Sequence, residues 1–188
     1  MATIHTGTTL APTKLELLAD WLPRQPWYRG EGGAPQLRRA GGFRLDDPAG
    51  EVGIEFMVVT DATSGAAYSV PMTYRAGPLA GADDGLIGVT EHGVLGTRWV
   101  YDAAQDPVAV TQLLAFICGR VEAQHQSRSD TPDPSVGRTW RAAGEPGPQQ
   151  LEVLRLPGGD VGPALGSVEC DWTCPDGSIA RGTVAVVR

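Results

Sequence analysis

The stretch EVGIEFMVVTD at residues 51–61 decides the fold, because its side chains alternate in character with a period of two. One set of positions comprises Val52, Ile54, Phe56 and Val58, and the other comprises Gly53, Glu55, Met57 and Val59. Such alternation is typical of a β-strand in a sheet that buries one face. We therefore expect a strand here, joined through turn residues 47–50 to a preceding strand at residues 43–47.

Two further segments continue this pattern. In AYSVPMTYR, residues 67–75, one face of a strand would carry Tyr68, Val70, Met72 and Tyr74. Pro71 has no amide proton to donate to a neighbouring strand, so we expect this strand at an edge or with a bulge. Residues 86–102 predict two strands in a hairpin, and the second strand holds Trp99 and Tyr101.

Two helices are predicted beside these strands. Residues 13–22 show helical spacing of leucines, and Thr13 can act as N-cap with Glu16 three residues on. Asp106 suits the N-cap of a second helix, and Pro107 suits its first turn. The apolar stripe of that helix, which fits a helix laid across the sheet, comprises Val110, Leu113, Leu114, Ile117 and Val121.

The composition changes after residue 124. Residues 125–150 are polar and rich in proline and glycine, which is typical of a linker or a long surface loop. Residues 151–188 predict three short antiparallel strands, with a hairpin turn at residues 175–177. We therefore expect a first domain at 1–124, a linker at 125–150 and a small β subdomain at 151–188.

The charge of the 188-residue chain excludes several classes of partner. Its formal net charge of -7 disfavours nucleic acid and anionic membranes, because both attract clustered cations. No run of about 18 apolar residues is present, so no membrane-spanning helix is predicted. The amino-terminal sequence lacks the features of a secretory signal, and three cysteines suit a reducing compartment. We therefore expect a cytoplasmic protein.

No residue pattern indicates catalysis, and we predict no catalytic residue, cofactor or metal. The histidines, expected to be solvated in separate loops, are His5, His92 and His125. The cysteines, expected to be structural because a C-x₃-C pair needs two further zinc ligands, are Cys118, Cys170 and Cys174. The acidic pairs, expected to cap turns, are Asp46-Asp47 and Asp83-Asp84.

Phosphate chemistry has little support in the sequence. The glycine-rich segments at 30–33 and 156–166 do not match a P-loop, although the second is a weak candidate for a phosphate-covering loop between two strands. No catalytic-loop or metal-binding motif of protein kinases follows, so we do not expect a complete kinase. A hydrolytic triad is defined by geometry, and the sequence leaves one built from scattered residues open.

The ordered segments between residues 13 and 124 resemble the N-terminal cap of actinobacterial maltokinases and related aminosugar kinases. In that family a leucine-bearing helix leads into a W-L-P-x-Q-x-W-[FY] stretch, followed by a Val-Pro strand and a Tyr-Asp segment. The matching residues are Trp21, Leu22, Pro23, Gln25, Trp27, Tyr28, Val70, Pro71, Tyr101, Asp102, Asp106 and Pro107. The resemblance implies an α+β fold, with a curved antiparallel sheet and flanking helices. It further implies that the small C-terminal antiparallel sheet resembles the start of a kinase N-lobe.

The same resemblance implies a function without catalysis. The segment VAVVR at 184–188 would fall near the strand that bears the nucleotide-binding lysine in those kinases, yet no lysine lies there. The implied function is that of a stand-alone, non-catalytic module that contacts a protein partner. That partner would be a kinase or an enzyme of α-glucan, trehalose or maltose metabolism.

The stretch WLPRQPWYRGEGG at residues 21–33 has two interpretations. In the cap family it is a structural corner, which implies buried Trp21 and Trp27 with Arg24 and Arg29 at the rim. The alternative is a basic, aromatic platform for a sugar or a partner protein. The candidate surface residues are therefore Arg24, Trp27, Tyr28, Arg29, Trp99 and Tyr101.

Two other functions compete with a contact module. One is sugar binding between sheet and helix, on an aromatic floor formed by Tyr68, Tyr74, Trp99 and Tyr101. The other is glucan processing, for example as a 1,4-α-glucan branching protein. Such enzymes resemble (β/α)₈ barrels of about 250 residues, and this chain is too short and lacks the strand–helix alternation. The sequence leaves the oligomeric state open.

Overall fold

The computed structural model describes residues 10–30, 33–128, 130–159 and 161–188, and within them one long antiparallel sheet carries two helices. The strands are β1 (Leu10–Ala11), β2 (Leu37–Leu45), β3 (Gly53–Asp61), β4 (Ala67–Arg75), β5 (Leu86–His92), β6 (Gly96–Asp102), β7 (Gln124–His125), β8 (Gly137–Trp140), β9 (Leu151–Val153), β10 (Gly166–Thr173) and β11 (Ile179–Val187). The helices are α1 (Lys14–Trp21) and α2 (Pro107–Ile117), and the 3-10 turns are η1 (Leu22–Arg24), η2 (Asp83–Gly85), η3 (Ala103–Gln105) and η4 (Pro148–Gln150). The predicted loop histidine His5, and Glu31 and Gly32 of the first glycine-rich segment, lie outside the described residues.

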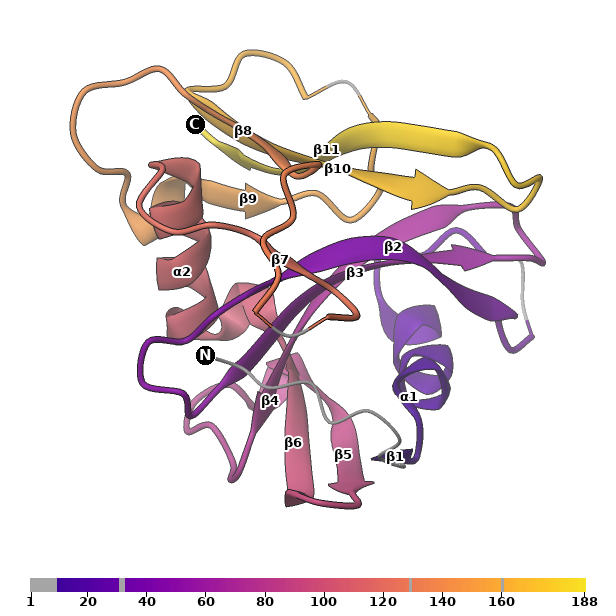
Figure 1. The fold of residues 1–188 in the computed structure, drawn as a ribbon. Coiled ribbons are helices and arrows are strands. Elements are labelled where there is room, and N and C mark those ends of the chain that lie inside the picture. Colours follow the sequence, from indigo (N-terminus) through magenta and orange to yellow (C-terminus); the bar gives the residue numbers. More distant parts are fainter. Residues whose placement is uncertain (1–9, 31–32, 129, 160) are drawn as a thin grey trace.

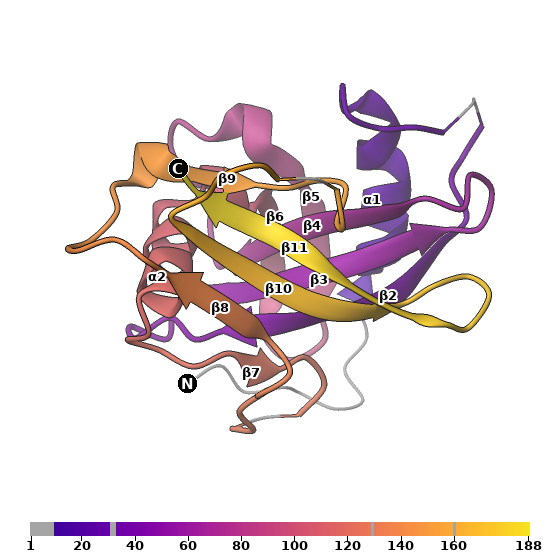
Figure 2. The ribbon, with the colours of Figure 1, turned by 90° about the horizontal axis from the view of Figure 1, so that it is seen from above.

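The sheet is open, curved and antiparallel throughout (Figure 1). Its strand order is β1-β5-β6-β4-β3-β2-β10-β11-β9, with β7 paired to β2 and β8 paired to β10. From above, β10 and β11 lie across β3 and β4 (Figure 2). The predicted α+β fold with an antiparallel sheet is confirmed. The resemblance of the C-terminal strands to a kinase N-lobe stays a prediction.

Strand β3 separates two apolar cores, because its side chains point alternately to opposite faces of the sheet. Ile54 and Phe56 pack in the core that contains α2, whereas Met57 and Val59 pack in the core that contains α1. Figure 1 shows the two helices on either side of the β2–β3 pair. The expectation of a single buried face is therefore wrong, since a helix covers each face.

Strand β4 is an inner strand between β3 and β6, so the prediction of an edge or a bulge at Pro71 is wrong. The ladder from β4 to β6 begins at Met72, directly after Pro71. The missing amide proton of Pro71 therefore costs no bond on the β6 side. Further back along β4, the Ser69 amide donates to the carbonyl oxygen of Arg155 at 2.9 Å.

Both predicted helix starts are confirmed. Thr13 and Glu16 form a reciprocal capping box at α1, and the Asp106 side chain accepts the Val108 amide at α2. Helix α2 ends at Ile117, earlier than its apolar stripe suggests. Gly119 follows with φ 77°, a left-handed conformation that favours glycine and ends a helix.

The C-terminal strands share a core with the first part of the chain. Val168, Trp172 and Val184 pack in the same cluster as α2 and Phe56. Trp172 of β10 pairs with Gly41 of β2, where an added Cβ would collide with the Asp171 carbonyl oxygen. Residues 125–150, expected as a linker, contribute His125 of β7 and the whole of β8 to the sheet. The division into residues 1–124, 125–150 and 151–188 stays a prediction. Strands from all three parts nevertheless belong to one sheet.

The glycine-rich segment at 156–166 does not turn between two paired strands. It leads from β9 to β10, and β11 lies between these two strands in the sheet. Gly158, at φ 83°, packs beside the ring of Trp172 and the backbone of Gly182. The contacts around Gly158 are those of a loop held down on the sheet.

Candidate interaction surface

The aromatic residues of the 21–33 stretch join helix α1 to the sheet. The Trp21 and Trp27 rings meet edge to face with centroids 5.8 Å apart, and Trp27 lies 6.0 Å from Tyr68 of β4. Tyr28 also contacts Tyr68, at 5.5 Å. Trp21 is buried, whereas Trp27 and Tyr28 are half-buried. These contacts are those of a packed corner.

The two arginines of this stretch lie at the surface. Arg24 donates through Nε to the Asp20 carbonyl at the end of α1. Arg29 is exposed, and its backbone amide donates to the Tyr68 hydroxyl at 3.1 Å. Their charges therefore face solvent at the rim of the aromatic corner.

Arg155 connects this corner to the Tyr-Asp segment. Its guanidinium lies 5.2 Å from the centre of the Trp27 ring, in cation–π range, and its Nη2 donates to Asp102 Oδ2 at 2.5 Å. Asp102 also accepts the Ala104 amide at the start of η3. Sequence reasoning missed Arg155, because the only local signal is one arginine within an apolar strand segment.

Trp99 and Tyr101 lie on the other face of the sheet from the 21–33 corner. In the β4–β6 ladder, Tyr74 is opposite Val100, whereas Trp99 is opposite Arg75. Because neighbouring residues of a strand point to opposite faces, Trp99 and Tyr101 point away from Tyr74 and from the α1 core. The structure therefore does not bring the proposed aromatic floor together on one surface.

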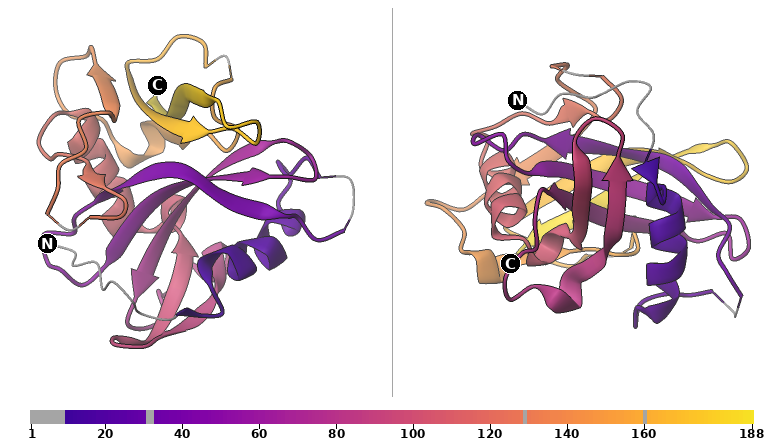
Figure 3. Two further views of the ribbon diagram at one scale, coloured as in Figure 1. Left: turned by 45° about the vertical axis from the view of Figure 1, so that its right-hand side comes forward. Right: turned by 90° about the horizontal axis from the view of Figure 1, so that it is seen from below.

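The two aromatic residues of β6 differ in exposure. Tyr101 is buried and its hydroxyl accepts the Leu79 amide at 2.9 Å. Trp99 is half-buried and pairs across the ladder with Val89 of β5, which is exposed. Figure 3 shows this β5–β6 hairpin at the lower end of the molecule, beside α1. Of the two rings, that of Trp99 is the one that reaches the surface.

Buried charge gathers at Glu55, on the α1 side of β3. The Glu55 carboxylate accepts hydrogen bonds from Lys14 Nζ at 2.5 Å, Tyr74 Oη at 2.8 Å and Gln126 Nε2 at 2.9 Å. Burial alone would raise the pKa of Glu55, but the Lys14 charge and these three donors outweigh it and keep the pKa lowered. Burial, followed by the Glu55 charge, raises the pKa of Tyr74 well above its ordinary value. Both carboxylate oxygens of Glu55 accept hydrogen bonds, which fits a structural role that links α1, the sheet and the segment after β7.

A second ion pair fixes the start of α2. Arg75 donates through Nε and Nη2 to the two carboxylate oxygens of Asp106, both at 2.7 Å. Burial would raise the pKa of Asp106, but the hydrogen bonds from Arg75 and other donors lower it. Asp106 thus acts as helix cap and ion-pair partner at once.

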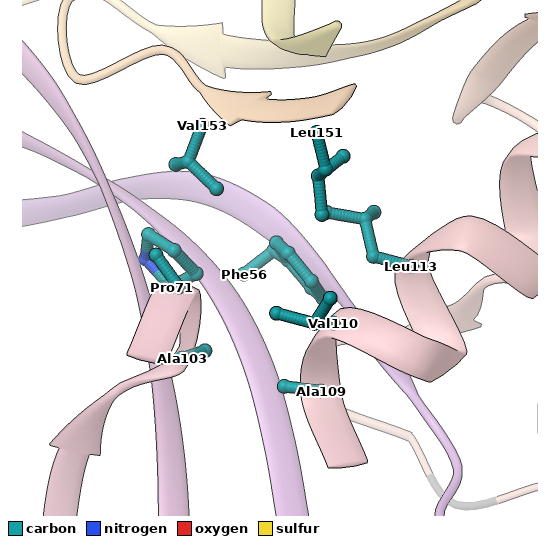
Figure 4. A pocket seen from close by; sticks show the side chains of 9 residues that line it. Phe56, Pro71, Ala103, Ala109, Val110, Leu113, Leu151 and Val153 are labelled. Carbon is teal, nitrogen blue, oxygen red and sulfur yellow. The ribbon is translucent and has the colours of Figure 1, made fainter. Parts of the chain in front are cut away.

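One small pocket lies between the sheet and α2 (Figure 4). Its space, counted together with the solvent at its open side, is about 170 Å³ and is too narrow to hold a water molecule, and its lining includes Phe56, Pro71, Val110, Leu113 and Val153. These side chains are all apolar and converge on the pocket from β3, β4, α2 and β9. Such a lining offers no hydrogen-bond partner for a sugar hydroxyl or a phosphate.

Several of the remaining titratable candidates have structural roles, whereas Asp83 and Asp84, expected to cap a turn, form no side-chain cap at η2. His92 and His125 each accept backbone amides through Nδ1 within their own turns. Asp47 accepts three backbone amides of the turn that follows it. Burial raises the pKa of the Cys170 thiol to about 12, which makes it a poor nucleophile. The part of the chain that the structure describes contains no cluster of three or more potential metal ligands.

No helix among the described residues is long and apolar enough to cross a membrane.

The protein-family model of the maltokinase N-terminal cap domain matches residues 21–106 of this chain. The matched part runs from the end of α1 through β2–β6 to the N-cap of α2. It contains the aromatic corner, Glu55 with its partner Tyr74, and the β5–β6 hairpin, whereas Lys14 and Gln126 lie outside it. No curated protein matches the chain. The predicted resemblance is thus confirmed, because these residues are similar to the maltokinase N-terminal cap domain.

Proposed function

We propose that this chain is a non-catalytic cap module that acts through protein–protein contacts in maltose, trehalose or α-glucan metabolism. The match to the maltokinase cap carries the proposal, because it supplies the metabolic context. The partner would be a kinase or another enzyme of that metabolism, and the setting would be the cytoplasm of an actinobacterium. The ionisable groups described above give the proposal further support, since they form ion pairs, helix caps and turns.

The test of this proposal is an activity assay. Purified protein is incubated with ATP and with maltose, glucosamine or glucan oligomers, and nucleotide turnover and sugar phosphate are measured. We expect no turnover above the rate without protein. Robust, sugar-dependent turnover by the purified chain would refute the proposal.

Sugar binding is the second candidate, and the half-buried Trp99 ring favours it, because exposed indole faces can stack on sugar rings. A titration of tryptophan fluorescence with maltose and longer glucans tests this function. A saturable change that disappears in Trp99→Phe would support sugar binding. A flat titration would eliminate this candidate and leave the contact module in place.

A further inference from the structure

The β5–β6 hairpin carries an apolar strip formed by Leu86, Val89 and Trp99. The register shift between Leu86 and Gly88 places Leu86 opposite Tyr101 and Val89 opposite Trp99. This bulge turns Leu86 and Val89, three residues apart, to the same face of the sheet. Leu86 is 36% exposed and Val89 38% exposed. Bulges are over-represented at sheet edges and next to active sites, and contiguous exposed apolar side chains mark interaction sites.

Acidic side chains flank both ends of this strip. Asp83 and Asp84 precede Leu86 in η2, and Glu91 follows Val89 on the same face of β5. All three are exposed, and within the described residues none of them forms an ion pair. From Leu86 to Glu91 strand β5 spans roughly 17 Å, at about 3.3 Å per residue.

The nearest cations do not neutralise the strip. Arg98 is opposite Thr90 and therefore points to the other face of the hairpin. Arg75 is next to Trp99 but is held by both carboxylate oxygens of Asp106. The strip therefore combines an apolar centre with net negative ends.

We propose that this strip docks a cationic amphipathic segment of a partner protein, with apolar residues at its centre and arginine or lysine at both ends. This inference rests on the proposed contact function and specifies the partner surface. A second copy of the chain fits poorly, because a two-fold contact would bring Asp83 and Asp84 of one copy against Glu91 of the other. An anionic membrane would be repelled by the same acids.

The experiment uses the full chain and two labelled synthetic peptides, followed by fluorescence anisotropy. One peptide has a Leu/Val/Phe centre with arginines at both ends, and the other has glutamates in place of the arginines. We expect saturable binding of the arginine peptide, weakened by added salt, and no binding of the glutamate peptide. Equal binding of both peptides, or binding of neither, overturns the proposal.

Matched variants locate the binding site. The double variant Leu86→Ser with Val89→Ser should weaken binding about tenfold or more, because it removes the apolar centre. Replacing Asp83 and Asp84 by Asn and Glu91 by Gln should remove most of the salt dependence. Ile179→Ser is the control, since Ile179 is 67% exposed at the distant β10–β11 turn and should leave binding unchanged. Circular dichroism confirms that each variant is folded.

Three outcomes contradict the proposal, either by moving the docking site or by changing its occupant. Binding that is unchanged in the Leu86/Val89 variant places the peptide elsewhere. A dimer that dissociates in that variant identifies a second copy as the occupant. Binding of the strip to anionic vesicles identifies a membrane. The proposed function is refuted by a different result, sugar-dependent ATP turnover by the purified chain, so the two proposals fail separately.

Discussion

At the scale of single residues, the strand pattern predicted the position of Glu55 but not its surroundings. Alternation placed Glu55 opposite the apolar set of β3, and a solvent-facing glutamate would be the ordinary expectation. The structure instead buries it among Lys14, Tyr74 and Gln126. These three partners come from distant parts of the chain, so no local sequence window could predict them.

The first prediction concerns the pH dependence of stability. The pKa of Glu55 is lowered in the folded state, so its charge stabilises the fold above its ordinary value of 4.5 and this contribution is lost as pH falls further. Glu55→Gln should lower the free energy of unfolding by about 2 kcal/mol near pH 7, because buried charged hydrogen bonds are lost. Urea titrations across the pH range measure this difference.

The difference between wild type and Glu55→Gln should shrink steadily below pH 4.5, where the wild-type carboxylate also becomes neutral. Glu51→Gln provides the control, since Glu51 is exposed just before the same strand. A difference that persists unchanged at strongly acidic pH would show that the charge of Glu55 is not the stabilising feature.

The second prediction concerns the contact of Arg155 with Trp27 and Asp102. Arg155→Lys keeps the charge but loses the planar group that stacks on the indole, so the free energy of unfolding should fall by about 1 kcal/mol. A double-mutant cycle with Trp27→Leu should show a coupling of similar size. Arg29→Lys, at an exposed site of the same corner, should have no measurable effect.

At the scale of elements, local sequence signals predicted where helices begin better than they predicted which strands pair in the sheet. Capping residues and proline gave both helix starts, because a cap is a contact within a few residues. The pairing of β10 with β2, at Trp172 and Gly41, was not predictable, since it depends on side chains far apart in the sequence. Likewise, β4 can be an inner strand because its ladder with β6 begins only at Met72, after Pro71. The presence of Pro71 in the sequence does not reveal where that ladder begins.

The third prediction separates the two roles of Asp106. Asp106→Asn retains an oxygen that can accept the Val108 amide but loses the ion pair with Arg75. Asp106→Ala loses both and should destabilise by about 3 kcal/mol, with the Asn variant in between. Thr13→Ala, which removes an exposed cap at α1, should cost about 1 kcal/mol. Thermal or urea unfolding measures all three; equal losses for the two Asp106 variants would contradict a separate role for the ion pair.

At the scale of the whole molecule, the sheet does not stop at the end of the cap match. Residues 21–106 match the cap domain, yet Val168, Trp172 and Val184 fill the same core as Phe56 and α2. The composition of residues 125–150 suggested a separation, but composition reports solvent exposure and does not report which strands share a core. A segment with the composition of a linker can therefore connect strands that belong to one continuous sheet.

The fourth prediction follows from this shared core. A chain truncated after residue 150 would expose the apolar side chains around Phe56 and α2 and should lose its cooperative thermal transition. In the full chain, Trp172→Ala should lower the stability of the whole sheet by about 3 kcal/mol or more, in a single transition. Differential scanning calorimetry measures both. A truncated protein that melts as sharply as the full chain would show that residues 151–188 fold separately.

The ion pair of Lys14 has a practical consequence for labelling. Lys14 is the one lysine in the sequence, and its ammonium group is bound to Glu55 while α1 is docked. Side-chain amine reagents therefore have a single target, and acylation of that amine requires the pair to open. The rate of such a reaction, followed by mass spectrometry, reports how often this ion pair opens, without any engineered reporter group.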